Sequence, residues 1–204
     1  PHDPLILILS GLSGSGKDTV IEALRNESEF DFRFVVTMNT RPIRENEVDG
    51  VDYHFTTREH FLEMIENGEL VEYAKVYEDY KGIPRFEIDQ ALASKTNIIL
   101  RVDHQGARKV KEDYPDAFSI FLLPPDSETW SSRLIGRGGD SDLQTRLETA
   151  DDELNHLDEF DYLVVNDDLS QTIRTIKAII CAESCRMHRN HLRRTPSTEK
   201  DHDA

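Results

Sequence analysis

The sequence predicts an α/β protein whose core is a parallel sheet covered by helices on both faces. Three observations support this prediction. Runs of branched apolar residues alternate with helical patterns, a phosphate-binding motif joins the first run to the first helix, and the chain, at 204 residues, is long enough for one sizeable core. We therefore expect one domain with a smaller lobe inserted into it.

The predicted strands of the core are short runs rich in Leu, Ile, Val and Phe, at 5–10, 97–103, 117–123 and 161–166. The first run leads into the amphipathic stretch DTVIEALRN, which predicts a helix. The segments FRFVVTMNT, DYHF and LVEYAKVYEDY come next, and their short alternating patterns predict a small mixed or antiparallel lobe with only one helical stretch, at 58–67.

The C-terminal half is predicted to be mostly helical. Residues 126–158 are highly charged, and GRGGDSD interrupts them, so we expect two helices around a flexible joint that could form a lid. A last helix runs from about 168 to the mid-180s. The segment 186–204 has no apolar periodicity and is predicted to be disordered.

The net charge of −16 makes nucleic acid and anionic membranes unlikely partners, because the long-range field repels polyanions. Phosphate binding must then come from a local basic cluster. No apolar stretch approaches 18 residues and no secretory signal is visible, so we expect a soluble cytoplasmic protein.

Two cysteines, Cys181 and Cys185, lie four residues apart on one side of the last predicted helix. With His188 they could be three metal ligands, but the spacing matches no zinc signature and a fourth ligand is not evident. We expect reduced, partly buried thiols.

The loop GLSGSGKDTV carries the first chemical signal. Gly11, Gly16 and Lys17 satisfy G-x-x-x-x-G-K, in which backbone N–H groups wrap phosphates and the lysine reaches the terminal ones. A Gly/Ser-rich turn is the alternative, but the strand before the loop and the helix after it favour nucleotide binding. Asp18 stands where a Ser or Thr hydroxyl usually meets Mg²⁺.

A second constellation lies in TMNTRPIRENEVDGVDYHF. Arg41 and Arg44 are three residues apart and Tyr53 follows. Two guanidinium groups and a phenol that converge on one spot suit a phosphate monoester, because arginine forks bind phosphate oxygens bidentately. The alternative is a pair of solvated surface arginines.

With these motifs the chain resembles the guanylate kinase family. The family's T-T-R-x-P-R-x-G-E-x-D-G-x-x-Y-x-F reads here as NTRPIRENEVDGVDYHF, and FLEMIENGELVEYAKV follows in register. VDHQGARKVK, LLPP, RLIGRG and VVNDDL come later, in the family's order and approximate spacing. The likeness covers about residues 5–180.

The resemblance implies the fold of a P-loop nucleoside-monophosphate kinase and the reaction ATP + GMP to ADP + GDP, with Mg²⁺ as cofactor and nucleotides as the only implied partners. One domain, 1–185, would contain a core, a lobe that binds the monophosphate and a helical lid. These parts would be the core at 1–37, 93–124 and 159–185, the lobe at 38–92 and the lid at 125–158.

It also implies roles for individual residues. The catalytic residues would be Lys17, Arg41, Arg137 and Arg146. The ATP site would combine the phosphate loop with lid arginines and a loop beside the base: Gly11, Ser13, Gly14, Ser15, Gly16, Lys17, Asp18, Thr19, Arg133, Arg137 and Asn166. The GMP site would lie in the lobe and at its border with the core: Thr37, Arg41, Arg44, Tyr53, Glu72, Lys81 and Asp103.

Guanine differs from adenine by the donors at N1 and the 2-amino group, so an unprotonated carboxylate is its natural reader. Glu72 matches the family's guanine-reading glutamate; a strand glutamate that faces water is the alternative. Asp103 matches the aspartate that supports the 2-amino side, and Thr37 matches the small hydroxyl residue that reaches O6. All three assignments come from the resemblance.

Some residues depart from the family pattern. A carboxylate at Asp18 can ligate Mg²⁺ directly or through water; alternatively it points away as a first-turn acid favoured by the helix dipole. Lys81 replaces a tyrosine, Ile83 replaces a hydroxyl residue beside O6, and Arg101 replaces an aspartate. Two other functions therefore stay open: a kinase for dGMP or another phosphate monoester, and a non-catalytic guanylate-kinase-like binding module.

Overall fold

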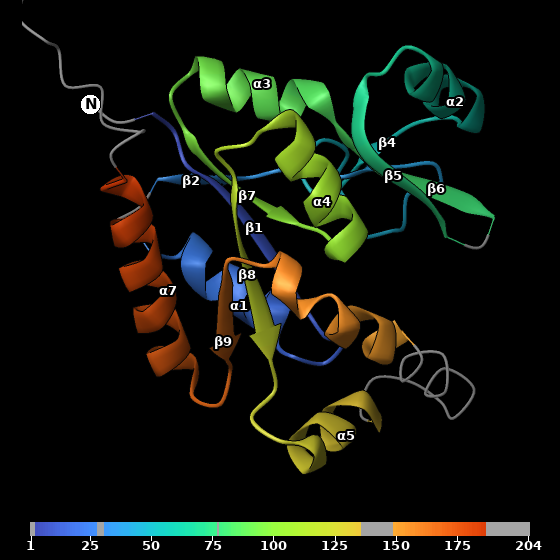
Figure 1. Cartoon of the computed structure of the whole chain (residues 1–204). Helices are drawn as coiled ribbons and strands as arrows, with labels where there is room; N and C mark the ends of the chain where they lie inside the picture. The colour runs from blue at the N-terminus through green and yellow to red at the C-terminus, as the bar shows by residue number, and fades with distance from the viewer. Residues whose placement is uncertain (1–2, 28–30, 77, 136–148, 187–204) are drawn as a thin grey trace, which may run out of the picture.

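The computed structural model describes residues 3–27, 31–76, 78–135 and 149–186 (Figure 1). Within these residues the core is a five-stranded sheet in which every strand pairs in parallel with its neighbours. The strands, in spatial order, are β2 (Phe32–Phe34), β7 (Asn97–Arg101), β1 (Ile6–Gly11), β8 (Phe118–Leu123) and β9 (Tyr162–Val165). The predicted parallel sheet is confirmed.

Helices cover both faces of this sheet, as Figure 1 shows. Helices α1 (Lys17–Arg25) and α7 (Leu169–Ser184) pack on the face to which β1 points Leu7 and Leu9. Helices α3 (Arg85–Ala93) and α4 (His104–Asp113) pack on the other face, against Ile6 and Ile8. Alternate side chains of a strand point to opposite faces, so the apolar run of β1 is buried on both sides.

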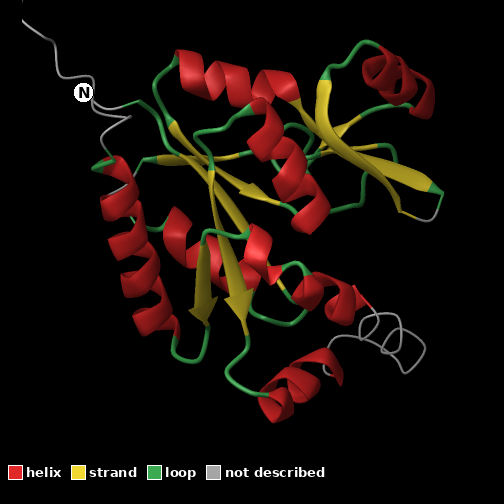
Figure 2. Ribbon diagram, viewed as in Figure 1, coloured by secondary structure: helices red, strands yellow, loops and turns green. Residues whose placement is uncertain are grey.

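The inserted lobe is a second, mixed sheet, visible on one side of the core in Figure 2. Its helix α2 (Arg58–Glu66) begins at the N-cap Thr57, whose hydroxyl accepts a hydrogen bond from the His60 N–H at 3.2 Å. The lobe has its own small core, formed by Met38, Phe61, Met64 and Leu70. The strands, in spatial order, are β4 (His54–Phe55), β3 (Met38–Asn39), β6 (Asp79–Pro84) and β5 (Leu70–Val76).

Two expectations about this region are wrong. The sequence predicted one helix between the first helix and β7, but α3 is a second one. Its pattern is misleading because Glu87 is buried on its inner face while Phe86 is 39% exposed. The run FRFVVTMNT is also divided between the two sheets, because β2 pairs with β7 of the core and only β3 joins the lobe.

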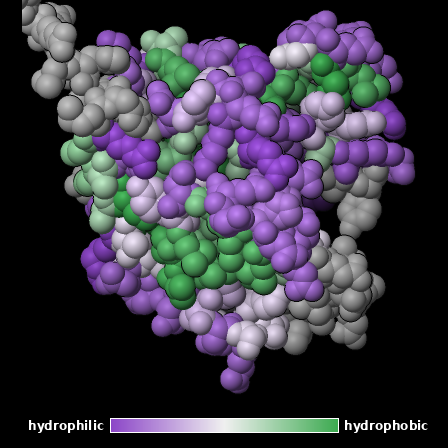
Figure 3. Space-filling view, viewed as in Figure 1, coloured by the Kyte–Doolittle hydropathy of each residue, from purple (hydrophilic) through white to green (hydrophobic). Residues whose placement is uncertain are grey.

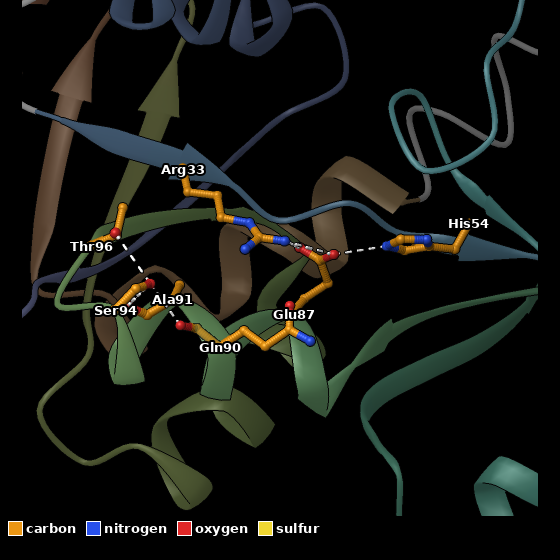
Figure 4. A network of polar contacts seen from close by, with 7 residues as sticks. All are labelled: Arg33, His54, Glu87, Gln90, Ala91, Ser94 and Thr96. Atoms are coloured by element: carbon orange, nitrogen blue, oxygen red, sulfur yellow. Dashed lines mark hydrogen bonds and ion pairs between the residues drawn. The ribbon is translucent and has the colours of Figure 1, made fainter.

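The buried Glu87 connects the lobe to the core. Its side chain is 2% exposed, and it accepts two hydrogen bonds from the Arg33 guanidinium of β2, at 3.0 and 2.9 Å. The Nε2 atom of His54, on lobe strand β4, lies 2.8 Å from the same carboxylate. Figure 4 shows the carboxylate between these two partners. A buried charge needs such partners, so the network fixes where β4 meets the core.

The region predicted to hold the lid begins and ends with helices, as expected. Helix α5 (Ser127–Ile135) follows β8, residues 149–155 are helical, and a short 3₁₀ helix, η1 (Leu157–Glu159), precedes β9. Ala150 packs with Leu12 and Phe121 in a fourth apolar cluster. The predicted joint between the two helices, and nearly all of the predicted disordered tail, lie outside the described residues.

The surface contradicts one expectation. Cys181 and Cys185 are free thiols, as predicted, but both are exposed, because α7 buries the neighbouring row of Ile173, Ile176 and Ile180 instead. An apolar patch on the face seen in Figure 3 lies over β8 and β9. Within the described ranges, no helix is long and apolar enough to cross a membrane.

Candidate active site

The phosphate loop follows β1 and ends at the first turn of α1. Gly16 has φ of 90°, and a Cβ atom at this position would lie 2.4 Å from the Nδ2 atom of Asn166, so only glycine fits. Asn166 is buried; its amide donates to the Ser15 carbonyl at 2.7 Å and accepts from the Thr172 hydroxyl at 3.0 Å. Asn166 therefore supports the loop from behind.

The groups of the loop suit an anion. The Lys17 ammonium donates to the carbonyl oxygens of Gly11 and of Leu12, the latter at 2.9 Å, so it folds over its own loop. The Ser15 hydroxyl is buried with no hydrogen-bond partner among the described residues. A helix N-terminus also directs N–H groups and a partial positive charge towards the loop. These groups can receive phosphate oxygens.

Asp18 and Arg101 form an ion pair. Asp18 lies in the first turn of α1, and Arg101 is the last residue of β7, the strand that pairs with β1. Their side chains are 56% and 50% exposed. Asp18 and Arg101 are two departures from the family pattern that the sequence does not connect, yet in the fold their side chains contact each other. Thr19, the next residue of the loop motif, is exposed.

A cluster of cations surrounds Tyr53 in the lobe. The Arg41 guanidinium lies 5.1 Å from the centre of the Tyr53 ring, and the Lys81 ammonium lies 5.8 Å from it. Arg41 also donates to the Glu47 carboxylate in a bidentate pair, and the Arg44 backbone N–H donates to the same carboxylate at 2.9 Å. The Arg41 hydrogen bonds lower the pKa of Glu47 to about 2.

A pocket lies beside this cluster, at the border of the lobe and the core. Arg101 and Tyr53 line both this pocket and a second one that reaches Asp18, so this pocket and the phosphate loop are neighbours. The other walls of the pocket between the lobe and the core are largely apolar and include Ile83. Five of the residues predicted to bind GMP line it: Thr37, Tyr53, Glu72, Lys81 and Asp103.

Glu72 is the unusual group of this pocket. Its pKa is raised from 4.5 to about 7, first because burial penalises the charged form and second because the Asp103 carboxylate repels it, while Lys109 offsets part of the shift. No described residue donates a hydrogen bond to this carboxylate. A Cβ atom on Gly106 would lie 3.2 Å from Glu72 Cγ, so the glycine leaves space for the side chain.

The structure thus brings most of the predicted site residues together, in two adjacent groups. Asp103 has a second task, because its carboxylate caps α4 by accepting the Gly106 N–H at 2.9 Å. Arg137 and Arg146 lie outside the described residues, and only the backbone of Arg133, in α5, is described.

Sequence reasoning missed three supporting residues. Glu47 holds Arg41, and its position six residues later in the same loop was the available signal. The Trp130 indole of α5 donates to the Ser13 carbonyl of the phosphate loop at 2.8 Å. Burial raises the pKa of Glu153, and nearby Lys17 partly offsets this. No spacing rule connects the last two residues to a loop more than a hundred positions away.

The model of the guanylate kinase family matches residues 4–183 of this chain. The chain belongs to the guanylate kinase family. It is 43% identical over 187 residues to a guanylate kinase of Enterococcus faecalis (91% of this chain, 92% of the relative) and 44% identical over 187 residues to one of Lactococcus lactis (91% of each).

A solved structure supports the same assignment. The chain matches the crystal structure of guanylate kinase from Anaplasma phagocytophilum with a TM-score of 0.72 and 32% sequence identity, over 92% of this chain and 90% of that one. The predicted resemblance and the predicted P-loop nucleoside-monophosphate kinase fold are therefore confirmed for this guanylate kinase family member.

Proposed function

We propose that this protein is a guanylate kinase that transfers the γ-phosphoryl group of ATP to GMP, giving ADP and GDP. The observation that carries the proposal is the adjacency of two different sites. One is a phosphate loop with Lys17, and the other is a pocket that joins the half-buried carboxylate of Glu72 to the cations around Tyr53. Relatives of this name, at 43% and 44% identity, support it.

On the donor side, the loop from Gly11 to Thr19 receives the phosphates of ATP. Lys17 exchanges its contacts with the loop carbonyls for phosphate oxygens, and Ser15 can donate its unpaired hydroxyl. Asn166 contributes by holding the loop, because its amide is already bound to Ser15. Its predicted contact with the ATP base stays a prediction.

Asp18 is the proposed ligand of Mg²⁺. A carboxylate oxygen is a ligand that Mg²⁺ prefers, and Asp18 is half-exposed next to Lys17, so the donor chemistry fits. When bound, Mg²⁺ neutralises charge on the transferred phosphoryl group. Asp18 has to exchange Arg101 for the metal, which would release the guanidinium towards the acceptor pocket that it already lines.

On the acceptor side, Arg41, Arg44, Tyr53 and Lys81 hold the monophosphate. Glu72 accepts hydrogen bonds from the guanine N1–H and the 2-amino group, Asp103 supports the second of these, and Thr37 donates to O6. Adenine offers an acceptor at N1, so it is repelled by the ionised carboxylate. Ile83 is 2% exposed and acts as an apolar wall of this pocket.

Transfer then needs positioning and charge neutralisation more than covalent help from the protein. We propose that the lid, 125–158, brings Arg133, Arg137 and Arg146 to the transferred group, and that the lobe, 38–92, moves with the bound GMP. The domain division into core, lobe and lid is part of this proposal. Free nucleotides are the partners, and the cytoplasm, where they occur, is the proposed location.

A coupled ADP-release assay with Mg²⁺-ATP tests the function. GMP should be turned over, and AMP and UMP should be far poorer acceptors. Equal rates with AMP would contradict the role of Glu72. A preference for dGMP or another monoester would mean that GMP is not the substrate. No turnover with any of GMP, dGMP, IMP, AMP, UMP and TMP would show that the protein is a non-catalytic binding module.

A metal titration tests Asp18 separately. The variant Asp18→Ser should stay active with a shifted Mg²⁺ optimum, whereas Asp18→Lys should be inactive, because it places a cation where the metal binds. If Asp18→Lys responds to Mg²⁺ like the parent, the carboxylate is no ligand.

A further inference from the structure

A cluster of two imidazoles and a carboxylate lies outside the proposed nucleotide sites. His104 is the first residue of α4, while Asp152 and His156 are one helical turn apart at the end of the segment 149–155. One ligand atom of each residue lies within 4.8 Å of the others. Figure 1 shows this segment beside the N-terminal end of α4.

The contacts within the cluster set which nitrogen atoms can bind a metal. The Nδ1 atom of His156 lies 3.1 Å from the Asp152 carbonyl oxygen, which can only accept, so Nδ1 carries the proton and Nε2 keeps its lone pair. The Nε2 atom of His104 lies 3.5 Å from the Asp152 carboxylate. The cluster therefore brings one nitrogen of each imidazole and one carboxylate oxygen within 4.8 Å of one another.

Burial adds a second, independent observation. The His104 residue is 5% exposed, and its Nδ1 atom is buried with no hydrogen-bond partner among the described residues. Its ring also lies 4.3 Å, centre to centre, from the ring of His156. Burial holds the ring in place with its Nε2 atom towards Asp152, so little side-chain freedom is lost when that nitrogen binds a metal.

Charged neighbours leave room for a cation. Glu112 lines the same depression, together with Gln105, Arg108 and Lys109. Arg108 is paired with Glu159, and Lys109 lies over the Tyr73 ring at 4.9 Å, so both nearby cations are already engaged. The depression is open to water, which can complete the coordination.

We propose that His104, Asp152 and His156 form a binding site for Zn²⁺ or a similar divalent transition metal. Two imidazoles and a carboxylate are typical ligands of such ions, and Mg²⁺ prefers oxygen ligands alone. The ligand atoms, which all lie within 4.8 Å of one another and 3.5 Å apart between His104 and Asp152, must come to about 3.3 Å, the separation set by tetrahedral bonds of about 2.0 Å. Small rotations of the exposed Asp152 side chain and of His156 supply this.

Occupation of the site would tie the segment 149–155 to α4. That segment carries Glu153, which interacts with Lys17, and α4 begins directly after Asp103 of the acceptor pocket. The metal would therefore restrain these two elements against each other, and this does not depend on the proposed function.

Binding of Zn²⁺ to the nucleotide-free protein tests the proposal. The full chain is used with Cys181→Ser and Cys185→Ser, because exposed thiols bind zinc. Titration against a chromophoric chelator should give one site that His156→Gln or Asp152→Asn weakens by at least about tenfold. Zn²⁺ should raise the melting temperature of the parent and not of these variants.

His60→Gln is the matched control, since this exposed histidine lies on α2 next to Glu63. It should bind Zn²⁺ like the parent. Substitution of Co²⁺ should give visible absorption bands that only His60→Gln and the parent share. Absence of binding by the parent, or binding as tight as the parent's in either His156→Gln or Asp152→Asn, would overturn the site. Circular dichroism confirms that each variant is folded, and kinase activity does not enter the readout.

Discussion

Two carboxylates of the acceptor side, Glu47 and Glu72, have pKa values displaced in opposite directions. In the loop between β3 and β4, Glu47 is paired with Arg41, and its pKa is lowered to about 2. In strand β5, burial and the Asp103 carboxylate raise the pKa of Glu72 to about 7. The two glutamates belong to one lobe, but only Glu47 has its charge satisfied by the protein.

The difference separates a residue that builds the site from a residue that awaits a ligand. Glu47 holds Arg41 beside Tyr53, so the cluster proposed to bind the monophosphate is formed in advance. Glu72 has no donor among the described residues, so an ionised carboxylate becomes favourable when guanine supplies its N1–H and amino groups. Selectivity for the base would thus depend on a charge that the folded protein leaves uncompensated.

The largest effect is expected at Lys17 of the phosphate loop, and not at Glu47 or Glu72. Lys17→Met should lower the turnover rate by at least about a hundredfold, because the ammonium stabilises charge in the transition state. The affinity for GMP should stay within about twofold of the parent. Single-turnover kinetics and GMP binding measure the two effects. A turnover rate close to that of the parent would show that the loop is not catalytic, and a parallel loss of GMP affinity would show that the two sides are not independent.

Removal of the negative charge of Glu72 should have the next largest effect. Glu72→Gln should weaken GMP binding by about 1.5–3 kcal/mol, or roughly 10- to 150-fold, the value of hydrogen bonds to a charged group. Calorimetric titration with GMP and AMP measures this. Glu66→Gln, an exposed position on α2, is the control and should bind like the parent. Unchanged GMP affinity in Glu72→Gln would show that the Glu72 carboxylate does not bind guanine.

The two glutamates should also affect stability with opposite signs. The folded-state pKa of Glu72 is above its ordinary value of 4.5, so its contribution is present at low pH and is lost as the pH rises from 4.5 to 7. Glu72→Gln should therefore stabilise the protein at pH 8, by on the order of 1–2 kcal/mol. Urea unfolding at pH 5 and pH 8 measures the difference.

The folded-state pKa of Glu47 is below its ordinary value, so its contribution is present above pH 4.5 and is lost as the pH falls towards 2. Glu47→Gln should therefore destabilise the protein at pH 8. Changes of the same sign in the two variants would show that both glutamates have the same structural role.

The smallest effect is expected at Lys81. Because its ammonium lies over Tyr53 with Arg41, Lys81→Tyr should change the KM for GMP by only about threefold and should reduce its dependence on salt. Initial rates at roughly 50 and 300 mM KCl measure how the KM for GMP changes as salt screens the charges. A salt dependence equal to that of the parent would place Lys81 away from the phosphate. Ile83 is less suitable for this test, because it is buried in the core.

The sequence was most informative where a physical pattern is local. Apolar runs predicted the core strands, and the glycines and lysine of the loop predicted its position between β1 and α1. The motifs predicted which side chains would gather in the acceptor pocket, and the structure places five of them there. Their chemical roles stay predictions.

Contacts between distant segments were not predictable in this way. Asp18 and Arg101 are 83 residues apart, and neither residue type indicates the other as its partner. Helix α3 was missed because Glu87 is buried, and its partners Arg33 and His54 come from two different sheets. The cysteines were predicted to be partly buried, because the apolar pattern of a helix does not determine how far the residues beside its buried row are covered.

Proton release on GMP binding tests the account most directly. At pH 7 a carboxyl group with a pKa of about 7 is half-protonated, so binding that requires ionised Glu72 should release about half a proton. Titration calorimetry in buffers of different ionisation enthalpy measures this number, with Glu47→Gln expected to behave like the parent. Release of about half a proton at pH 7 that declines towards zero by pH 8.5 is the predicted result. No release, or proton uptake, at pH 7 would contradict the assignment of Glu72 as the uncompensated reader of guanine.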